Sequence, residues 1–470
     1  MDEIWKFGAY KTAELIKTRK ISVTEAVSSS IERIKIKNPK INAVVDDLSE
    51  EALKEAKQLD KSSKNGKMKG PLHGVPITIK ENIDQQGYST PNGLVALKDL
   101  IAPGNAPVVD NLKDAGAIII GRTNTPEFSM RGTTDNVLHG RTFNPWNDWA
   151  SPGGSSGGAS AAVMSGMGAL AHGNDIAGSL RIPSTATGAT TVKPGLGRVP
   201  AYNPSQTQER GIIAQLMSVQ GLIAREVKDV RLGMKSLIKY DPRDPWMVEV
   251  PFESPELEKP IKIGYTKETL GEELDPAVEK AIDNAKKALE DAGYILEEVQ
   301  LPEFLETSTF SARTLFGEIK ALHQKDYEAY GSETFNEIAS NYFQLTEPFQ
   351  GNDLFLGMAK RSYFFRLWNL FFQKYPLVLT PFLLYQTYEW NRDAQGLEGT
   401  KEVLAGMFYA HTMNYLGIPG GVISANYNDG LPVGVQIISS RYREDWILNA
   451  CEAIESRIGI MAEKLFSREN

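Results

Sequence analysis

The sequence predicts an α/β protein with a large, twisted mixed β-sheet covered by helices on both faces. Short β-branched runs alternate with segments of helical apolar spacing, which is the pattern of such sheets. The chain has 470 residues, 41% of them hydrophobic, which is enough for a sizeable core. No apolar run reaches the roughly 18 residues of a membrane span. One large domain or two domains are both compatible with this length.

The N-terminal part predicts helices. Ser22 and Glu25 form a capping box, in which each side chain satisfies a free N–H group at the helix start, and apolar residues at helical spacing continue to Ile34. A second helix is expected over 50–59. The polar, basic segment 61–70 predicts an exposed loop.

Two buried strands are expected next. Residues 75–79 form a β-branched run that ends at Lys80, and 117–121 predict a strand after a helix that ends near Gly116. Residues 123–146 predict a loop-rich segment, of the kind that often carries function.

Two serine sites lie among glycines in the segment 151–200. The sequences GGSSGG at 153–158 and AGSLR at 177–181 flank 159–171, which is small and apolar on nearly every side. A segment that is apolar all round is buried, so we expect a short core helix with a serine-bearing loop at each end. Glycine allows positive φ and close approach, which suits N–H groups arranged around a reacting atom. Each loop alone is equally compatible with a glycine-rich surface turn.

The C-terminal half continues the alternation. Helices are expected over 275–292 and 445–458, and strands over 261–265, 295–299, 377–380, 421–425 and 432–438. The stretch 355–372, rich in Phe, Leu, Tyr and Trp, favours a core helix over the wall of an apolar substrate pocket. Residues 241–260, rich in Pro, Asp and Glu, are the expected place of a subdomain joint.

Composition excludes several classes of protein. The net charge of −8 argues against a nucleic-acid-binding surface as the main function. The single Cys451 excludes an intramolecular disulfide and a cysteine-based zinc site. The first residues lack a signal-peptide pattern, so we expect a cytoplasmic protein without a membrane segment. No zinc-protease, CxxC or phosphate-loop motif is present, which predicts no metal and no cofactor.

A serine nucleophile in this chain needs a base other than histidine, since none of the five histidines has a recognisable triad context. A lysine serves if burial lowers its pKa from about 10.4. The segment 154–158 formally matches G-x-S-x-G, with Ser156 as an α/β-hydrolase nucleophile. That motif requires a strand directly before it, whereas 144–152 predicts a loop.

Several motifs in this order resemble the amidase signature family of serine amidohydrolases. They are GVPITIKEN at 74–82, TNTPEF at 123–128, GTTDN at 132–136, the glycine–serine loop at 152–158, DIAGSLRIP at 175–183, KP with GRVP within 193–200, GIP at 417–419 and GLPVGVQ at 430–436. Residues 172–175, 217–221 and 243–246 are similar to the bacterial branch of broad-specificity amidases, which includes enzymes acting on short linear or cyclic amides.

The resemblance implies the amidase signature fold as a single domain over 1–470, with the catalytic core at about 70–205. It also implies a Ser–Ser–Lys triad. Ser179 would be the nucleophile, Ser155, held in a cis peptide, would relay the proton, and Lys80 would be the base. The reaction would pass through an acyl-enzyme intermediate.

The resemblance implies roles for further residues by analogy. The oxyanion hole would use the backbone N–H groups of Ile176, Ala177, Gly178 and Ser179. The residues near the substrate would be Met130, Arg131, Gly132, Gly153 and Gly154. Asp175 and Arg181 would support the loop from behind. Ala177 stands where the family commonly has glycine, so the hole differs if that residue needs positive φ.

The expected function is therefore hydrolysis of a carboxylic amide to an acid and an amine. The expected partner is a small amide substrate, with an apolar or aryl group favoured by the aromatic C-terminal region, and a homodimer is the candidate assembly. Two alternatives stay open: the A subunit of a glutamyl-tRNA amidotransferase, which shares the triad, and an inactive family scaffold.

Overall fold

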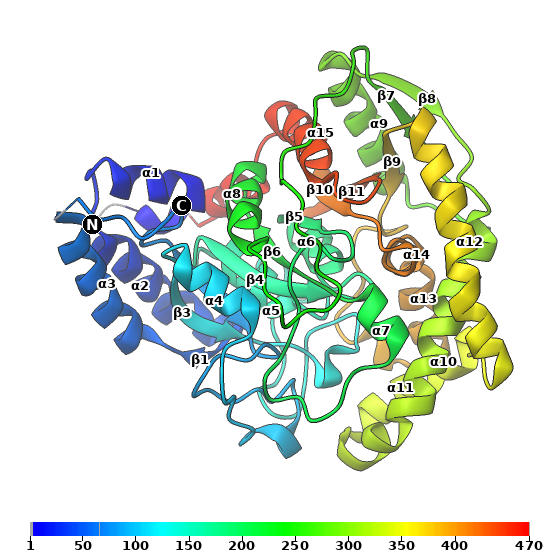
Figure 1. The fold of residues 1–470 in the computed structure, drawn as a ribbon, viewed down its shortest axis with the longest axis horizontal. Helices are drawn as coiled ribbons and strands as arrows, with labels where there is room; N and C mark the ends of the chain where they lie inside the picture. Colours follow the sequence, from blue (N-terminus) through cyan, green and yellow to red (C-terminus); the bar gives the residue numbers. More distant parts are fainter. Residues whose placement is uncertain (1–2, 65, 470) are drawn as a thin grey trace.

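The computed structural model describes residues 3–64 and 66–469. Its centre is a mixed, eleven-stranded sheet with the order β1-β3-β2-β4-β6-β5-β10-β11-β9-β7-β8 (Figure 1). The strands are β1 Val44–Asp47, β2 Pro76–Lys80, β3 Ile118–Thr123, β4 Leu170–Asp175, β5 Thr190–Lys193, β6 Val219–Ala224, β7 Lys262–Tyr265, β8 Ile295–Glu298, β9 Leu377–Pro381, β10 Gly420–Asn428 and β11 Leu431–Ser439.

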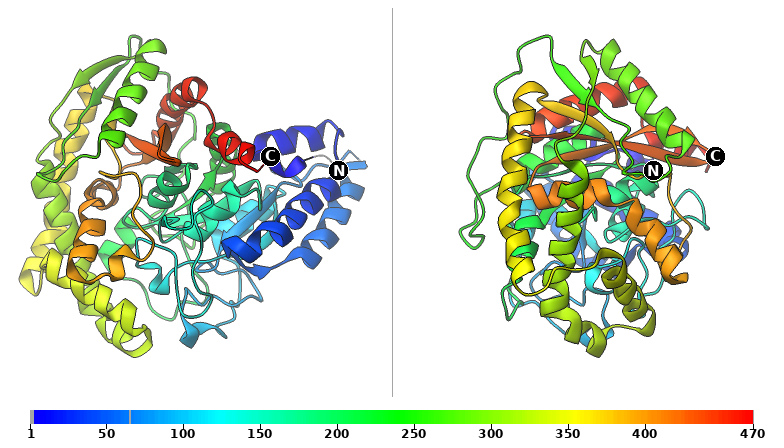
Figure 2. Two further views of the ribbon diagram at one scale, coloured as in Figure 1. Left: turned by 180° about the vertical axis from the view of Figure 1, so that it is seen from behind. Right: turned by 90° about the vertical axis from the view of Figure 1, so that its right-hand side faces the viewer.

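Helices surround this sheet (Figures 1 and 2). They are α1 Ala9–Lys17, α2 Val23–Ile41, α3 Ser49–Lys64, α4 Pro107–Asp114, α5 Gly157–Met164, α6 Arg181–Thr187, α7 Ile212–Met217, α8 Val227–Leu237, α9 Pro276–Asp291, α10 Phe304–Tyr330, α11 Glu333–Thr346, α12 Asn352–Lys374, α13 Gly396–Ala405, α14 Phe408–Leu416, α15 Glu444–Ile458 and α16 Met461–Ser467. Short 3₁₀ turns occur at Ile4–Lys6, Val95–Leu97, Glu127–Ser129 and Arg392–Ala394.

Close packing through glycines shows that both faces of the sheet are covered. A Cβ added at Gly421 of β10 would contact Ile447 of α15, and one added at Gly434 of β11 would contact Thr185 of α6. Gly434 pairs with Ser424, three residues along β10 from Gly421. Because side chains alternate along a strand, the two glycines face opposite sides. The predicted α/β class with helices on both faces is therefore confirmed.

Two neighbouring parallel strands bring the candidate site together. Ile77 of β2 pairs with Leu170 of β4, so both strands end at the same edge of the sheet. Lys80 is the last residue of β2 and Asp175 is the last residue of β4. Ligands bind at the carboxyl ends of such strands in many α/β proteins.

The helix predicted over 159–171 is wrong in its second half. Helix α5 ends at Met164, and the chain then enters strand β4 at Leu170. Gly166 and Gly168 have positive φ between the two elements. Their conformation ends the helix, and an apolar stretch of small residues does not by itself distinguish a buried helix from a buried strand. The loop that contains Ser179 therefore follows a strand rather than the helix.

Most of the other predicted elements are confirmed with small shifts in their boundaries. The expected loop at 61–70 is wrong at its start, because α3 continues to Lys64. Four strands were not predicted, namely β1, β4, β5 and β6. The segment 241–260 has neither helix nor strand, and β7, which follows it, pairs with β9 in the same sheet. The single domain and the subdomain joint remain predictions.

Helix α12 contains the aromatic stretch and packs through one face only. Phe364 and Trp368 are fully buried. On the outer face Phe355, Leu356 and Leu370 are 69%, 65% and 70% exposed. Figure 2 shows this helix at the edge of the molecule. The stretch thus forms part of the core along one stripe. Among residues 3–64 and 66–469, no helix combines the length and apolarity needed to span a bilayer.

Candidate active site

Lys80 is buried at the end of β2 and contacts three side chains. Its Nζ lies 2.7 Å from Ser155 Oγ, 3.1 Å from Ser156 Oγ and 2.9 Å from Asn174 Oδ1. The lysine is fully shielded from solvent. A buried lysine pointing at two serine hydroxyls is the arrangement that a serine–lysine hydrolase needs.

The surroundings favour the neutral form of this lysine. Burial lowers the pKa of Lys80 to about 7, although the negative charges of Asp175 and Glu81 act in the opposite direction. A base whose pKa lies near neutral pH both accepts and returns a proton at that pH. Lys80 therefore has the burial, the contacts and the pKa of a general base.

The two serines lie just before helix α5, in the glycine-rich loop. The Gly154–Ser155 peptide bond is cis. Ser156 N donates to the carbonyl oxygen of Ser179 at 3.2 Å, which ties this loop to the second serine loop. Nearly every residue from 150 to 164 is buried, so neighbouring segments hold the first loop from all sides.

Ser179 is partly exposed in the turn between β4 and α6. The turn is held from behind by Asp175, whose carboxylate accepts hydrogen bonds from Leu180 N at 3.1 Å and Gly178 N at 2.8 Å. The Asp175 carboxylate also meets Arg181 through Nη2 at 3.0 Å and Nε at 3.1 Å. Burial alone would raise the pKa of Asp175, but Arg181 and the N–H donors lower it to about 2. The carboxylate is therefore always charged near neutral pH.

The four N–H groups expected in the oxyanion hole differ in their partners. The N–H of Gly178 donates to Asp175 Oδ1 at 2.8 Å. Within the described part of the chain, the N–H groups of Ile176, Ala177 and Ser179 have no acceptor. Positive φ occurs at Gly178, at 116°, and not at Ala177. Alanine at 177 is thus free of the backbone strain that its position suggested.

The Arg131 side chain is engaged within the protein. Its guanidinium binds Asp393 through Nε at 3.1 Å and Nη2 at 2.8 Å, and it reaches Asn391 at 2.5 Å. This side chain is buried and joins two distant segments of the chain. The sequence signal did not reveal this, because the ion-pair partner lies 262 residues away.

The three glycines expected near the substrate are buried and closely packed, Gly153 and Gly154 against backbone and Gly132 against side chains. Added Cβ atoms would approach Tyr388 at Gly132, Pro183 at Gly153 and the carbonyl of Arg131 at Gly154 within 2.6 Å. The lack of a side chain is therefore a packing requirement at these three positions.

Met130, Ile176 and Ala177 are partly exposed and pack against an apolar cluster. This aromatic cluster is drawn from α10, α11, α12 and α14, and its buried aromatic members are Phe304, Phe316, Tyr327, Phe335, Tyr342, Phe364, Trp368, Phe372, Tyr375, Phe408, Tyr409 and Tyr415. Two of the free N–H donors, those of Ile176 and Ala177, therefore belong to residues that border this cluster.

Sequence reasoning missed Asn174 and Asn82. Asn174 Nδ2 donates to Asn82 Oδ1 at 3.0 Å, and both amides lie beside Lys80 at the ends of β4 and β2. Both lie in segments that resemble the family, at 74–82 and 172–175, but the resemblance assigned neither of them a role. The parallel pairing of β2 with β4 would have been the signal, but the residues that begin β4 predict a helix.

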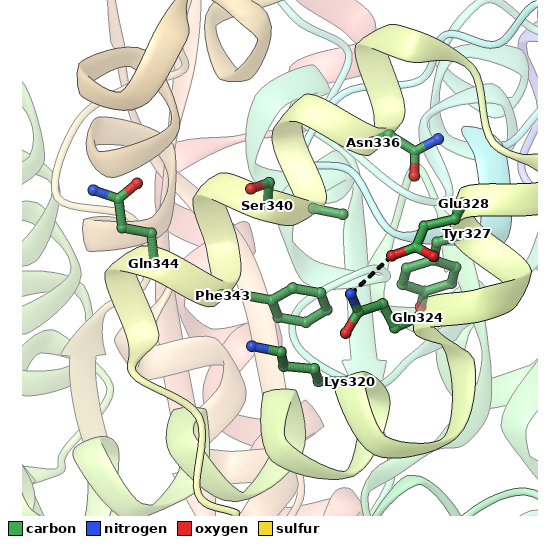
Figure 3. Close-up of a pocket in the computed structure, with 9 residues that line it drawn as sticks. Lys320, Gln324, Tyr327, Glu328, Asn336, Ser340, Phe343 and Gln344 are labelled. Carbon is green, nitrogen blue, oxygen red and sulfur yellow. Dashed lines mark hydrogen bonds between the residues drawn. The ribbon is translucent and has the colours of Figure 1, made fainter.

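A cavity of about 520 Å³ lies between α10 and α11, and neither Lys80 nor Ser155 nor Ser179 lines it (Figure 3). Tyr327 and Phe343 line it together with polar side chains such as Lys320. The Tyr327 ring packs against Phe128 with centroids 4.6 Å apart and the rings tilted by 55°. Among residues 3–64 and 66–469, no group of three or more His, Cys, Asp and Glu side chains is placed to hold a metal ion.

Comparison with known proteins agrees with this geometry. The family model described as Amidase matches residues 25–448. Indoleacetamide hydrolase of Bradyrhizobium diazoefficiens is 44% identical over 464 residues, covering 98% of this chain and 88% of that protein. The A subunit of the glutamyl-tRNA(Gln) amidotransferase of Carboxydothermus hydrogenoformans is 30% identical over 484 residues, covering 96% and 97%. The structure of 6-aminohexanoate cyclic dimer hydrolase complexed with substrate superposes with a TM-score of 0.83 at 26% identity, covering 97% and 98%.

Proposed function

Because the chain belongs to the Amidase family and is an amide hydrolase acting on a C–N bond, we propose that Ser179, Ser155 and Lys80 form its catalytic triad. The contact that supports this most strongly is the 2.7 Å distance between Lys80 Nζ and Ser155 Oγ. The burial of Lys80 and its pKa of about 7 supply the neutral amine that the role needs.

The mechanism follows from these positions. Ser179 Oγ attacks the amide carbonyl, its proton passes to Ser155, and the proton of Ser155 passes to Lys80 Nζ. The proton then returns by the same route to the leaving nitrogen, the C–N bond breaks, and an acyl-enzyme ester remains on Ser179. Water attacks this ester with the same base, so that R–CO–NHR′ and water become R–COOH and R′–NH₂.

The tetrahedral intermediate carries a negative oxygen that requires donors. We assign this role to the free N–H groups of Ile176, Ala177 and Ser179. Removing one such donor in other enzymes costs about 10²–10³ in rate, so a set of three is sufficient for a strong effect. Asp175 and Arg181 do not touch the substrate in this proposal. They hold the turn that aims the three donors.

We propose an arylacetamide as the substrate, with indole-3-acetamide as the first candidate. The relative at 44% identity is named for the hydrolysis of indoleacetamide. The aromatic cluster next to Met130, Ile176 and Ala177 supports the assignment, since aromatic surfaces favour an aromatic ligand. The product amine is then ammonia. The lower identity of the amidotransferase relative, 30%, gives that alternative less support.

The test measures ammonia release from indole-3-acetamide, phenylacetamide, acetamide and glutamine. Hydrolysis of the two aryl amides with kcat/KM at least tenfold above acetamide and glutamine supports the substrate class. A preference for glutamine would overturn it. Labelling by a fluorophosphonate, mapped by mass spectrometry, tests the nucleophile separately. One adduct on Ser179, absent in Ser179→Ala, supports the triad, whereas an adduct on Ser156 overturns it.

The cytoplasmic location and the homodimer remain predictions. Size-exclusion chromatography with light scattering tests the dimer, which predicts a mass near twice the 51.9 kDa of one chain.

A further inference from the structure

A one-directional series of hydrogen bonds begins at Lys80. Its Nζ donates to Asn174 Oδ1 at 2.9 Å, and Asn174 Nδ2 donates to Asn82 Oδ1 at 3.0 Å. Asn82 Nδ2 donates to Ser129 Oγ at 3.0 Å, and Ser129 Oγ donates to Asn92 Oδ1 at 2.6 Å. Each amide accepts at its oxygen and donates at its nitrogen. Hydrogen bonds in such a series polarise and strengthen one another.

The direction of this series is fixed by Asn174 being next to a lysine. The hydrogens on Lys80 Nζ find an acceptor in the Asn174 carbonyl oxygen but would oppose its NH₂ group. The NH₂ group of Asn174 is engaged on the other side by Asn82. Asn174 Oδ1, which also accepts from Asn82 Nδ2 at 3.4 Å, therefore faces Lys80 as an acceptor without a proton to give.

The Asn174 side-chain oxygen orients the N–H groups of the neutral lysine. A neutral amine has two N–H groups and one lone pair. Asn174 Oδ1 takes one N–H, and Ser156 Oγ, at 3.1 Å, takes the other while its own hydroxyl faces the carbonyl of Asn174 at 3.4 Å. The third direction, towards Ser155 Oγ at 2.7 Å, is left for the lone pair. This is the orientation in which Lys80 accepts the proton of Ser155.

We infer that Asn174 is a positioning residue that turns the lone pair of Lys80 towards Ser155 and, being uncharged, leaves the lysine free to lose its proton. The inference rests on the proposed role of Lys80 as the base. It adds that the amide at 174 sets the pH at which this base becomes active.

Two near-isosteric substitutions are expected to move that pH in opposite directions. Asn174→Asp places a negative charge against Nζ and holds the ammonium form, so the pKa of Lys80 rises by about one to three units. Asn174→Leu removes an acceptor from the ammonium, so the pKa of Lys80 falls. Its maximal rate also falls, because the lone pair is no longer held towards Ser155.

The experiment measures the rate constant for fluorophosphonate labelling of Ser179 between pH 5 and 10, which does not depend on knowing the amide substrate. In the wild type the rate is expected to rise with pH to a plateau above about pH 7. Asn174→Asp is expected to shift the midpoint up by at least one unit and to label at least about fivefold more slowly at pH 7. Asn174→Leu is expected to shift the midpoint down and to lower the plateau about tenfold. Melting temperatures establish that each variant is folded.

Asn111→Asp is the matched control. Asn111 is buried and donates to the carbonyls of Leu237 and Lys239, far from the serines in the fold. It is expected to lower the melting temperature without moving the midpoint. If an Asn174 variant fails to fold, Asn82→Leu provides the second test, because it removes the oxygen that accepts from Asn174 Nδ2. It is expected to move the midpoint in the direction of Asn174→Leu, by less.

The outcomes separate the inference from the function it rests on. Unchanged midpoints in folded Asn174 variants, with or without slower labelling, would overturn the positioning role and leave a structural one. Labelling of the wild type without hydrolysis of aryl amides would overturn the substrate proposal and leave this inference standing. A wild-type rate that is independent of pH would overturn the role of Lys80 itself, and the inference with it.

Discussion

The Arg181 guanidinium lies against the Asp175 carboxylate through two parallel hydrogen bonds of 3.0 and 3.1 Å, fully buried beside the turn that carries Ser179. The same guanidinium reaches Gln436 Oε1 at 2.8 Å and Asn414 Oδ1 at 2.5 Å. The turn that carries Ser179 is therefore connected by one side chain to β11 and α14.

Replacing Arg181 by Lys is expected to lower both stability and activity. A lysine keeps the charge but cannot form the two-bond fork, so Asp175 and Gln436 lose partners. Breaking a buried ion pair costs about 3–5 kcal/mol when one charge is left alone, and Arg181→Lys is expected to cost about 2 kcal/mol or more. Urea unfolding measures this. Unchanged stability would mean that the turn is held by Gly178 and Leu180 alone.

Lys80→Met is expected to reduce kcat/KM at least about 100-fold, the size of a general-base contribution. In the wild type, kcat/KM is expected to rise tenfold per pH unit up to about pH 7 and then to level, because the neutral amine is the active form and the pKa of Lys80 is about 7. The full pH profile of both proteins is the measurement. Wild-type activity in the variant across this range would exclude Lys80 as the base.

The same lysine makes stability depend on pH. The pKa of Lys80 is about 7 in the folded chain, and about 10.4 in the unfolded chain. Between these values the unfolded state binds the extra proton, so the free energy of unfolding contributed by Lys80 rises as the pH increases from about 7 to 10. The difference in unfolding free energy between wild type and Lys80→Met is therefore expected to shift in favour of the wild type over this range. A difference that is constant with pH would contradict the lowered pKa.

The two adjacent serines are expected to differ in their effects. Ser155→Ala removes the group that relays the proton and is expected to reduce kcat/KM at least about 100-fold. Ser156→Ala removes one acceptor at 3.1 Å from Lys80 and is expected to cost about tenfold or less. The ratio of kcat/KM between the two variants is the measurement, with the melting temperature of each variant as a check on folding. The reverse order would favour the α/β-hydrolase interpretation of the G-x-S-x-G match.

Ser332 is expected to matter more for stability than an ordinary helix cap. Its hydroxyl accepts from Phe335 N at the start of α11 and donates to Glu127 Oε2 at 2.6 Å, beside the active-site segment. Ser332→Ala is expected to cost about 2 kcal/mol, through the lost cap and the unpaired buried carboxyl. Ser22→Ala, which removes an exposed cap from α2, is the matched control at about 1 kcal/mol. Equal losses in urea unfolding would show that the Glu127 contact contributes nothing.

Local sequence patterns predict the elements whose signal is local. The capping box at Ser22 is present as both of its hydrogen bonds, and the strand ending at Lys80 is correct. The stretch that becomes β4 is compatible with a helix as well as a strand, because Ala169, Leu170 and Ala171 suit either state. Its true state depends on pairing with β2 and β6, which lie far away in the sequence.

In the candidate site, too, residues with a local sequence signal could be predicted and contacts without one could not. Lys80, Ser155 and Ser179 are named by motifs that resemble a family, and the structure places Lys80 against Ser155. The use of the Gly178 N–H by Asp175 was missed, because it depends on the path of the turn rather than on residue type. The pairing of Arg131 with Asp393 was missed because no local pattern connects positions 262 residues apart.

The partners of Arg181 also bear on how the enzyme is made in the cell. Gln436 and Asn414 come 255 and 233 residues after the arginine. A chain emerging from the ribosome therefore displays Ser179 long before the groups that fix its loop have been translated. The growing polypeptide is expected to have no hydrolytic activity until β11 has emerged, so that nascent and prematurely terminated chains cannot attack amides in their surroundings.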